Sequence, residues 1–320
     1  ARYGKKIQMN EGVCPAYSDC RMGLSPDRFI LSYCDRALGI TSAEEQPVLP
    51  KGNNLSLHLL ELFTSQVAKV GMTDGIRQVL QEESDALRAY YEQAGILIAR
   101  PAGGTSCRLA ISAKGGTNAE NHNHNDVGSY AVALGSETMV GDQGGPNSYP
   151  GDYFNGDAPQ KYKIKGSFGH PVPVVDGRTQ SSGGKAKGVV LQKEFTNEKD
   201  VFSIDYTSAY STPNLDKLIR TFVYDRQGKG NFTVGDEFTA KTPIRFETAI
   251  TTRADWKILD DTHLLLATDS EQMIVAIEAS GKVAFTSETI EVNSPAYTRI
   301  GIALKNQSKE GYIRLKMYTK

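Results

Sequence analysis

Short apolar segments that alternate with polar residues recur at regular spacing from about Gly95 to the C-terminus, and this pattern constrains the fold more than any other feature. Successive side chains of a strand point to opposite faces, so a period of two predicts strands with one buried face. Gly135-Ser136 fits the turn of a hairpin between two of them. The predicted strands are 96–99, 108–112, 129–134, 138–140, 188–195, 201–206, 218–224, 231–238, 244–251, 262–267, 273–278, 299–304 and 313–318.

Many short strands separated by turn signals are typical of an antiparallel sandwich. The unit from about residue 91 to 320 is too long for one seven-stranded immunoglobulin-type domain. We therefore predict a mainly β protein, built on a large multi-stranded antiparallel β-sandwich.

The first ninety residues have a different pattern. Apolar residues between Leu55 and Val70 recur at steps of three and four, which predicts a helix that Asn53 or Asn54 could cap. Weaker helical patterning continues from Leu80 through Tyr90 and ends near Gly95. A further helix is expected at 29–38, and 46–52, with two prolines, is expected to be a connection. The sequence thus predicts a helical segment at 1–90 and a β domain at 91–320.

Composition narrows the class of protein. The chain has 320 residues and a formal net charge of -1, with 36 Lys+Arg against 37 Asp+Glu. A nucleic-acid-binding protein usually carries a basic excess or stripe, and none is visible, so we expect no nucleic-acid partner. No apolar run approaches the roughly 20 residues of a membrane span. The four cysteines are few for this length and lack CxxC spacing, which favours free thiols over a disulfide framework. The chain starts at Ala1 without Met or a signal segment, which suggests a processed chain or a piece of a longer one.

Three of the five histidines lie close together in the sequence, in the motif NHNHND and in a GHP segment downstream. In an extended strand, His122 and His124 would point to one face. His124, Asp142 and His170 could supply the three protein ligands of a Zn²⁺ site with an open fourth position. An HxH pattern alone is weak evidence for a metal site, and the alternative is that these histidines form hydrogen bonds in a polar loop. The surrounding Asn, Asp and Gly are poor strand formers, which favours the functional interpretation.

Several segments together resemble one known family. These are 116–129 with its NHNHNDVGS core, 140–145, Tyr149 with Phe154, 167–170, and 175–177. In this order they resemble the C-terminal β-domain of the heparinase II/III family of polysaccharide lyases. Residues 15–20 are similar to the short FGDS segment near the end of that family's helical toroid. The resemblance covers nearly the whole chain and implies that 1–90 is the α-helical remnant of an (α/α) toroid whose larger N-terminal part is missing here.

The resemblance also implies residue roles. His124, Asp142 and His170 match positions that bind a metal, usually zinc, although Ca²⁺ or another divalent ion stays open. His122 matches the active-site histidine of the β-domain, and Tyr149 a recurrent tyrosine; Tyr153, in the same loop, is a further catalytic candidate. Substrate binding is assigned to Asn121, Asn123 and Lys163. Gln143 and Pro171 depart from the family pattern of a proline and an asparagine, so the surroundings of the metal are expected to differ.

Lysines flank the third motif at 161, 163, 165, 185 and 187. Such a group is either a solvated loop or a contact for an anionic sugar. The second interpretation fits an acidic polysaccharide, which needs positive charge only along one cleft.

The resemblance implies cleavage of a uronic-acid-containing acidic glycan by β-elimination, in a periplasmic or secreted protein. Such a reaction needs a base for the C5 proton, a group that neutralises the carboxylate, and an acid for the leaving oxygen. The family takes its main tyrosine and an Asn or His from the toroid. Two alternatives stay open: a metal-stabilised β-sandwich that only binds carbohydrate, and cupin-like metal-dependent oxygenase or hydrolase chemistry, which the Asp142 context fits poorly.

Overall fold

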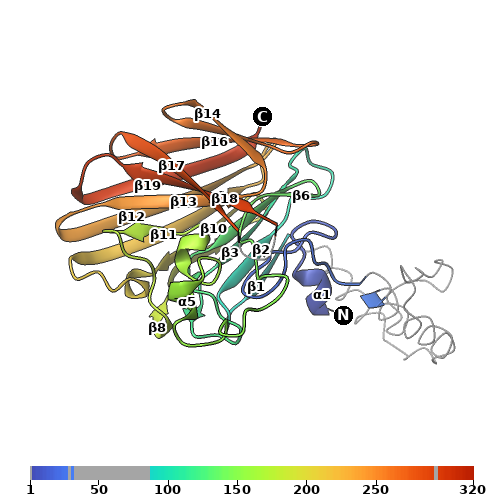
Figure 1. Cartoon of the computed structure of the whole chain (residues 1–320). Coiled ribbons are helices and arrows are strands. Elements are labelled where there is room, and N and C mark those ends of the chain that lie inside the picture. The colour runs from blue at the N-terminus through green and yellow to red at the C-terminus, as the bar shows by residue number, and fades with distance from the viewer. Residues whose placement is uncertain (1, 28–29, 32–86, 292–294) are drawn as a thin grey trace, which may run out of the picture. The chain divides into compact units, whose positions relative to one another are not determined.

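Strands of the expected pattern pair into antiparallel sheets (Figure 1). The computed structural model describes residues 2–27, 30–31, 87–291 and 295–320. The chain divides into two compact units: Ala1–Gln8 with Ser25–Ala86, and Met9–Leu24 with Leu87–Lys320. The prediction of a mainly β, antiparallel sandwich is confirmed.

Little of the first unit is described: it includes helix α1 (Arg2–Lys6). The predicted helix at 55–70 and the connection at 46–52 lie outside the described residues, as does 29–38 apart from residues 30–31. The division into domains 1–90 and 91–320 stays a prediction. Met9–Leu24, however, belongs to the unit that holds the strands.

Among its described residues, the second unit contains three sheets and one short pair of strands. The eight-stranded sheet has the order β14 (Asp255–Asp260), β15 (His263–Ala267), β16 (Gln272–Ala279), β19 (Ser308–Thr319), β12 (Asn231–Ile244), β11 (Leu215–Asp225), β10 (Lys199–Asp205), β9 (Val189–Phe195). The five-stranded sheet has the order β1 (Arg88–Tyr91), β2 (Ile96–Ala99), β3 (Leu109–Lys114), β5 (Tyr130–Leu134), β6 (Glu137–Val140). The four-stranded sheet has the order β17 (Val283–Ile290), β18 (Tyr297–Leu304), β13 (Phe246–Thr252), β7 (Val174–Val175). The short elements are β4 (Thr117–Asn118) paired with β8 (Gly183–Lys187), α5 (Ala158–Lys161), η1 (Ser167–Gly169) and η2 (Thr207–Ala209).

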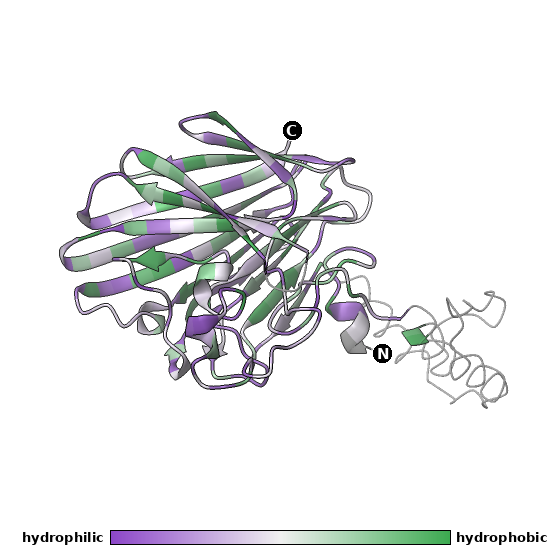
Figure 2. Ribbon diagram, in the orientation of Figure 1, coloured by the Kyte–Doolittle hydropathy of each residue, from purple (hydrophilic) through white to green (hydrophobic). Residues whose placement is uncertain are grey.

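The sheets share one hydrophobic core. Burial alternates along β11 and β12, and Figure 2 shows the matching alternation of hydrophobic and hydrophilic residues along the long strands. Tyr130 of β5 packs against Phe222 of β11 and Phe232 of β12, with ring centroids 6.2 and 5.9 Å away. The five-stranded sheet therefore faces the eight-stranded one, which is the sandwich that the alternation predicts.

Differences from the sequence prediction fall at the sheet edges. The helical patterning expected to run through Tyr90 is wrong, because Arg88–Tyr91 forms β1 and pairs with β2 in register Ala89 to Ile98. A four-residue segment is too short for periodicity to separate strand from helix, and the partner strand decides. The pattern also missed β14 and β17, two edge strands: β14 is mostly exposed, β17 is mostly half-buried or exposed, and in neither does burial alternate.

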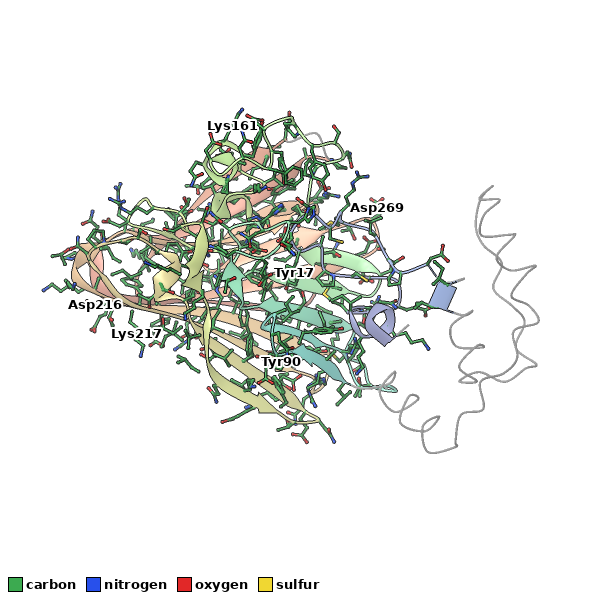
Figure 3. The ribbon with its side chains drawn as sticks, turned by 90° about the horizontal axis from the view of Figure 1, so that it is seen from below. Tyr17, Tyr90, Lys161, Asp216, Lys217 and Asp269 are labelled. Atoms are coloured by element: carbon green, nitrogen blue, oxygen red, sulfur yellow. The ribbon has the colours of Figure 1, made fainter. Side chains whose placement is uncertain are left out.

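Residues 9–24 cover the outer face of the five-stranded sheet. Strand β3 is buried along its whole length, so both of its faces are covered. Met9, Val13 and Ala16 are buried. The Tyr17 hydroxyl lies 2.8 Å from Ser112 Oγ of β3, and Figure 3 shows Tyr17 among the side chains of the sheets. This contact brings a segment from the start of the chain beside the loops that carry the histidines.

Among the described residues, no helix has the length and apolar character needed to cross a bilayer.

Candidate functional site

Both histidines of the NHNHND motif lie in a loop between β4 and β5, and not on a strand. The expectation that His122 and His124 share one strand face is therefore wrong. His122 has a positive φ of 56°, which turns the chain between them. The His122 side chain is 64% exposed, whereas that of His124 is fully buried. The loop thus presents one imidazole to solvent and one to the interior.

The structure brings His124, Asp142 and His170 together. One candidate ligand atom from each lies within 4.8 Å of the others, and all three side chains are buried. Asp142 follows the end of β6, and His170 follows η1. The sequence-based grouping is thus a real cluster, and it could hold a metal ion.

Unpaired buried atoms fit a cation at this cluster. His170 Nδ1 and Asp142 Oδ2 are 3.0 Å apart but are not aligned for a hydrogen bond. Neither these two atoms nor His124 Nδ1 has a hydrogen-bond partner among the described residues. Burying polar atoms without partners is costly, and a metal ion that accepts three such lone pairs removes the cost. The other nitrogen of His124, Nε2, lies 3.1 Å from Asp19 Oδ1, as expected for a metal-binding imidazole whose second N–H is held by a carboxylate.

Burial and mutual charge shift the pKa values of all three side chains of the cluster. Burial lowers the pKa of His124 by more than its hydrogen bond to Asp19 raises it, so the ring stays neutral, which is the form that binds metal. Burial acts most strongly on His170 and would lower its pKa, but the contact with Asp142 and the charge of Asp126 together raise it. For Asp142, burial is again the largest cause and would raise the pKa, but the contacts with His170, His124 and the backbone of Gly144 together lower it. Asp142 therefore supplies the negative charge of the cluster.

Asp19 joins the two histidines of the motif. Its Oδ2 lies 2.7 Å from Nδ1 of the exposed His122, and its Oδ1 lies near His124. Burial acts to raise the pKa of Asp19, but the hydrogen bonds to His124 and His122 together outweigh burial and lower it. The carboxylate is therefore ionised. The sequence interpretation gave Asp19 no role, although it is the acidic residue of segment 15–20. Only the resemblance of that segment could have pointed to it, because about a hundred residues separate Asp19 from the motif.

Segment 16–21 is held at the site by backbone contacts to the residues that follow Asp142. Ala16 and Arg21 form isolated bridges with Gln143 and Gly144, and Gly145 N donates to Cys20 O at 3.2 Å. Gly144 has a φ of +72°, and a Cβ there would lie 1.7 Å from Cys20 O. Only glycine fits both the conformation and the space.

We predict that Gly144→Ala displaces segment 16–21 and destabilises the protein by about 1–3 kcal/mol, the usual cost of overpacking with a strained backbone. Amide hydrogen exchange should show faster exchange in 16–21, and urea denaturation should show the loss of stability. Gly151→Ala is the matched control, since Gly151 has open space around its Cβ position. Equal effects of the two substitutions would contradict the proposed docking.

The candidate tyrosines occupy different environments. Tyr153 is fully buried, and its hydroxyl lies 3.1 Å from His124 Nε2. Tyr149 is 43% exposed and packs on the exposed Phe154, with ring centroids 5.0 Å apart. Burial raises the pKa of both tyrosines, and the charge of Asp19 adds to the rise. Both hydroxyls therefore stay protonated at neutral pH, contrary to the lowered pKa that a tyrosine base needs.

His122, Tyr149 and Phe154 form an exposed group that we call the His122 face. The His122 ring meets the Phe154 ring edge-on at 5.7 Å. The nearby lysine is Lys165, whose Nζ lies 4.8 Å from the centre of the Phe154 ring and donates to Tyr153 O. Lys165 is buried, so it supports the loop from beneath.

The residues predicted to bind substrate are placed as follows. Asn121 is exposed beside His122, and Asn123 is half-buried, with its Oδ1 lacking a partner among the described residues. Lys163 is exposed and forms an ion pair with Glu288 of β17. The two asparagines therefore lie in the motif loop, whereas the Lys163 side chain is held by another sheet.

Comparisons with known proteins bear on the fold. A scan against protein-family models and a search of curated proteins give no match. Among solved structures, the chain is similar to a heparinase III with methylated lysines, with a TM-score of 0.66 and 12% identity over 99% of this chain and 44% of that one. It is similar to another heparinase III with a TM-score of 0.65 and 15% identity, over 99% of this chain and 47% of that one. It is also similar to heparan sulfate lyase HepC from Pedobacter heparinus, with a TM-score of 0.64 and 13% identity, over 98% of this chain and 45% of that one. At these identities the likeness shows a shared fold, and the chain spans less than half the length of each of these proteins.

Proposed function

We propose that this chain is the β-domain portion of a polysaccharide lyase that cleaves a uronic-acid-containing acidic glycan by β-elimination. One observation carries the proposal: an exposed imidazole, His122, is oriented by an ionised carboxylate beside a buried His-Asp-His cluster. The fold likeness to heparinase III and heparan sulfate lyase structures supports it. A substrate of this kind is met outside the cytoplasm, and we propose a periplasmic or secreted protein.

Residue roles follow from exposure and protonation. Asp19 holds His122 at Nδ1, which leaves Nε2 for the substrate: with a proton it can donate to the uronate carboxylate, and without one it can accept the C5 proton. The protonated hydroxyl of Tyr149 is suited to donate a proton to the leaving glycosidic oxygen. Loss of the C5 proton and cleavage of the C4–O bond leave a C4–C5 double bond in one product and a hydroxyl on the other.

We propose Zn²⁺ as the metal, held by His124, Asp142 and His170. Two imidazoles and one carboxylate suit zinc better than Ca²⁺, which prefers oxygen ligands. A bound ion would fix the geometry of the loops that carry the site. Its contribution is structural, since His122, the proposed catalytic histidine, is not among its ligands.

A carbohydrate-binding protein without catalysis is the second candidate. The observation that favours it is the raised pKa of both Tyr149 and Tyr153, so that neither supplies a base. If the chain belongs to a lyase, a further residue from outside the described part of the chain would supply the base together with His122.

The experiment that separates these functions is an absorbance assay for unsaturated uronate products. The full-length protein should produce them from heparan sulfate or another uronate-containing glycan, and His122→Ala should lower kcat by about 10²–10⁴-fold, the usual contribution of a general acid or base. His263→Ala is the matched control, because His263 is partly exposed and pairs with Asp260, apart from the His122 face. Full turnover in His122→Ala would remove the catalytic role, and glycan retention without product would favour the binding protein.

A further inference from the structure

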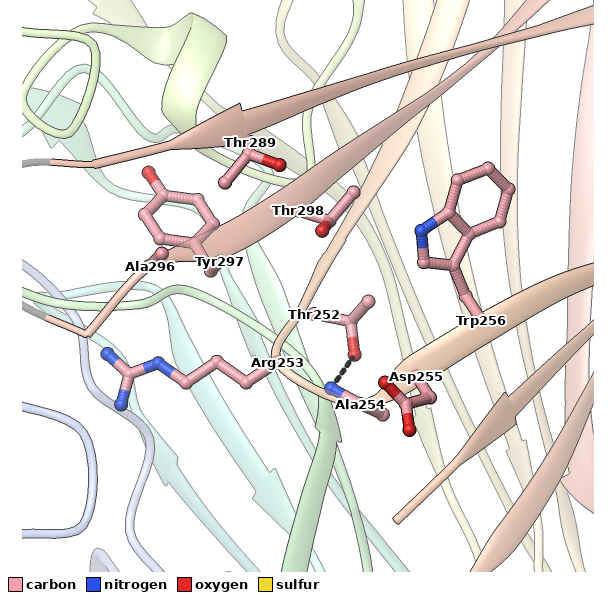
Figure 4. A pocket seen from close by; sticks show the side chains of 9 residues that line it. All are labelled: Thr252, Arg253, Ala254, Asp255, Trp256, Thr289, Ala296, Tyr297 and Thr298. Carbon is pink, nitrogen blue, oxygen red and sulfur yellow. Dashed lines mark hydrogen bonds between the residues drawn. The ribbon is translucent and has the colours of Figure 1, made fainter.

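A polar pocket of about 420 Å³ lies at one end of the four-stranded sheet (Figure 4). Its walls come from the connection between β13 and β14 and from the facing ends of β17 and β18. We call it the Trp256 pocket, lined chiefly by Arg253, Asp255, Trp256, Thr289, Tyr297 and Thr298. Its volume falls within the usual range for small-molecule sites.

A row of threonines crosses the pocket. Thr252 of β13 lies opposite Thr298 of β18, which lies opposite Thr289 of β17. Directly opposite residues of neighbouring strands present their side chains on one face, so the three hydroxyls line up. Thr252 donates to Met139 O at 2.6 Å. The hydroxyls of Thr298 and Thr289 have no partner within the described ranges and are available to a ligand.

Trp256 forms another wall. It is the single tryptophan of the chain, and it is half-buried and packed against the core. Figure 4 shows the nitrogen edge of the indole turned toward Thr298. Nothing in the described part of the protein accepts a hydrogen bond from this N–H. Trp256 thus offers both an apolar ring and a donor to the pocket.

Two charged side chains complete the rim. Arg253 and Asp255 are exposed, flank Ala254, and point to different sides of the chain in Figure 4. Neither forms an ion pair or a side-chain hydrogen bond with any other residue that the structure describes. Surface charges are often solvated, but two of opposite sign beside one tryptophan and two unpaired hydroxyls form a set of donors and acceptors around a ring-sized space.

We propose that the Trp256 pocket binds one pyranose residue of an oligosaccharide. A sugar ring presents apolar C–H groups, which suit the indole, and a rim of hydroxyls that both donate and accept. Asp255 can accept from two neighbouring hydroxyls, while Arg253 and the two threonines donate to ring or carboxylate oxygens. The lining contains too few apolar side chains to suit a purely apolar ligand.

This pocket is distinct from the His122 face but is tied to the same loops. Tyr297 lines the pocket, and its hydroxyl donates to Gly169 O at 3.0 Å, directly before His170. An oligosaccharide held here would therefore be anchored on the four-stranded sheet, behind the metal-binding loop. The inference does not rest on the lyase reaction, since binding at Trp256 requires no residue of the His122 face.

The single tryptophan makes a direct test available. Titration of the protein with a tetrasaccharide of alternating hexuronic acid and N-acetylhexosamine should give a saturable change in tryptophan fluorescence. Arg253→Ala and Asp255→Ala should each weaken the apparent affinity about tenfold or more, the value of one charge-assisted hydrogen bond. Both residues are exposed, so these variants should fold, and the test does not depend on substituting Trp256, which packs against the core.

A matched control fixes the location of binding. Lys257→Ala, at an exposed position on the same strand, should keep the wild-type titration. Absence of a saturable change up to millimolar tetrasaccharide, or the same affinity in wild type and the Arg253→Ala/Asp255→Ala double variant, would overturn the proposal. Failure of the elimination assay together with a normal titration would contradict the proposed lyase activity and would leave binding at the Trp256 pocket supported.

Discussion

Arg220→Met is expected to lower the free energy of unfolding by about 3–5 kcal/mol, the cost of leaving a buried charge without its partner. Arg220 is fully buried in β11 and binds Asp236 of β12 through two nitrogens, at 2.7 and 2.6 Å. Methionine fills much of the same volume but leaves the Asp236 carboxylate, among the residues that the structure describes, with hydrogen bonds from Tyr206 and Thr248 alone. Urea denaturation would measure the loss.

The same substitution should also weaken metal binding. Arg220 Nη1 donates to Gly128 O and to Pro171 O, both at 2.7 Å. Gly128 closes the loop that carries His124, and Pro171 directly follows His170, so one guanidinium holds two of the three loops that carry the proposed metal ligands. Loss of an outer partner of this kind typically costs 10–100-fold in metal affinity. Zinc titration of the folded variant, below its denaturation range, checks this effect.

Two further variants give the controls. Arg314→Met breaks the exposed pair with Glu278 on the same sheet, and should cost no more than about 1 kcal/mol. Arg220→Met/Asp236→Leu removes both buried charges and should recover part of the lost stability. If Arg220→Met costs no more than Arg314→Met, the buried pair does not organise this core.

Saturating zinc is expected to raise the midpoint of thermal unfolding by about 5–10 °C over the chelated protein. A ligand at 100 times its Kd stabilises by about 2.7 kcal/mol, and each kcal/mol shifts the midpoint by about 2–4 °C in a domain of this size. The shift should disappear in His170→Ala and in Asp142→Asn, because each removes a ligand from the cluster. Differential scanning calorimetry with and without a chelator would show it.

His263→Ala should keep the full zinc response, since His263 pairs with Asp260 on β14 and β15. Calcium should give a smaller shift than zinc, because two of the three ligands are nitrogens. An equal response in wild type and His170→Ala would place the zinc elsewhere, and no response in wild type would remove the site.

Sequence reasoning succeeded where burial follows a period, and it failed where contacts join distant parts of the chain. Strands such as β11 and β12 were predictable because one face of each is buried and the residues alternate. The exposed edge strand β14 has no such signal, and the conformation of β1 depends on its partner strand β2, which local periodicity does not show. His124, Asp142 and His170 were found from residue type and motif order. Asp19 was not, since its role depends on a segment that docks from far away in the chain.

That docking has a consequence for the order of folding. The bond between Asp19 and His122 closes a chain separation of 103 residues, whereas the hairpin of β5 and β6 closes one of a few residues. Local pairings close at low entropic cost, and distant ones follow. We expect the sheets to assemble first, and His122 and His124 to be fixed only when segment 9–24 packs against them. A chain that lacks residues 1–24 should then be rescued by a synthetic 9–24 peptide, in the manner of fragment complementation.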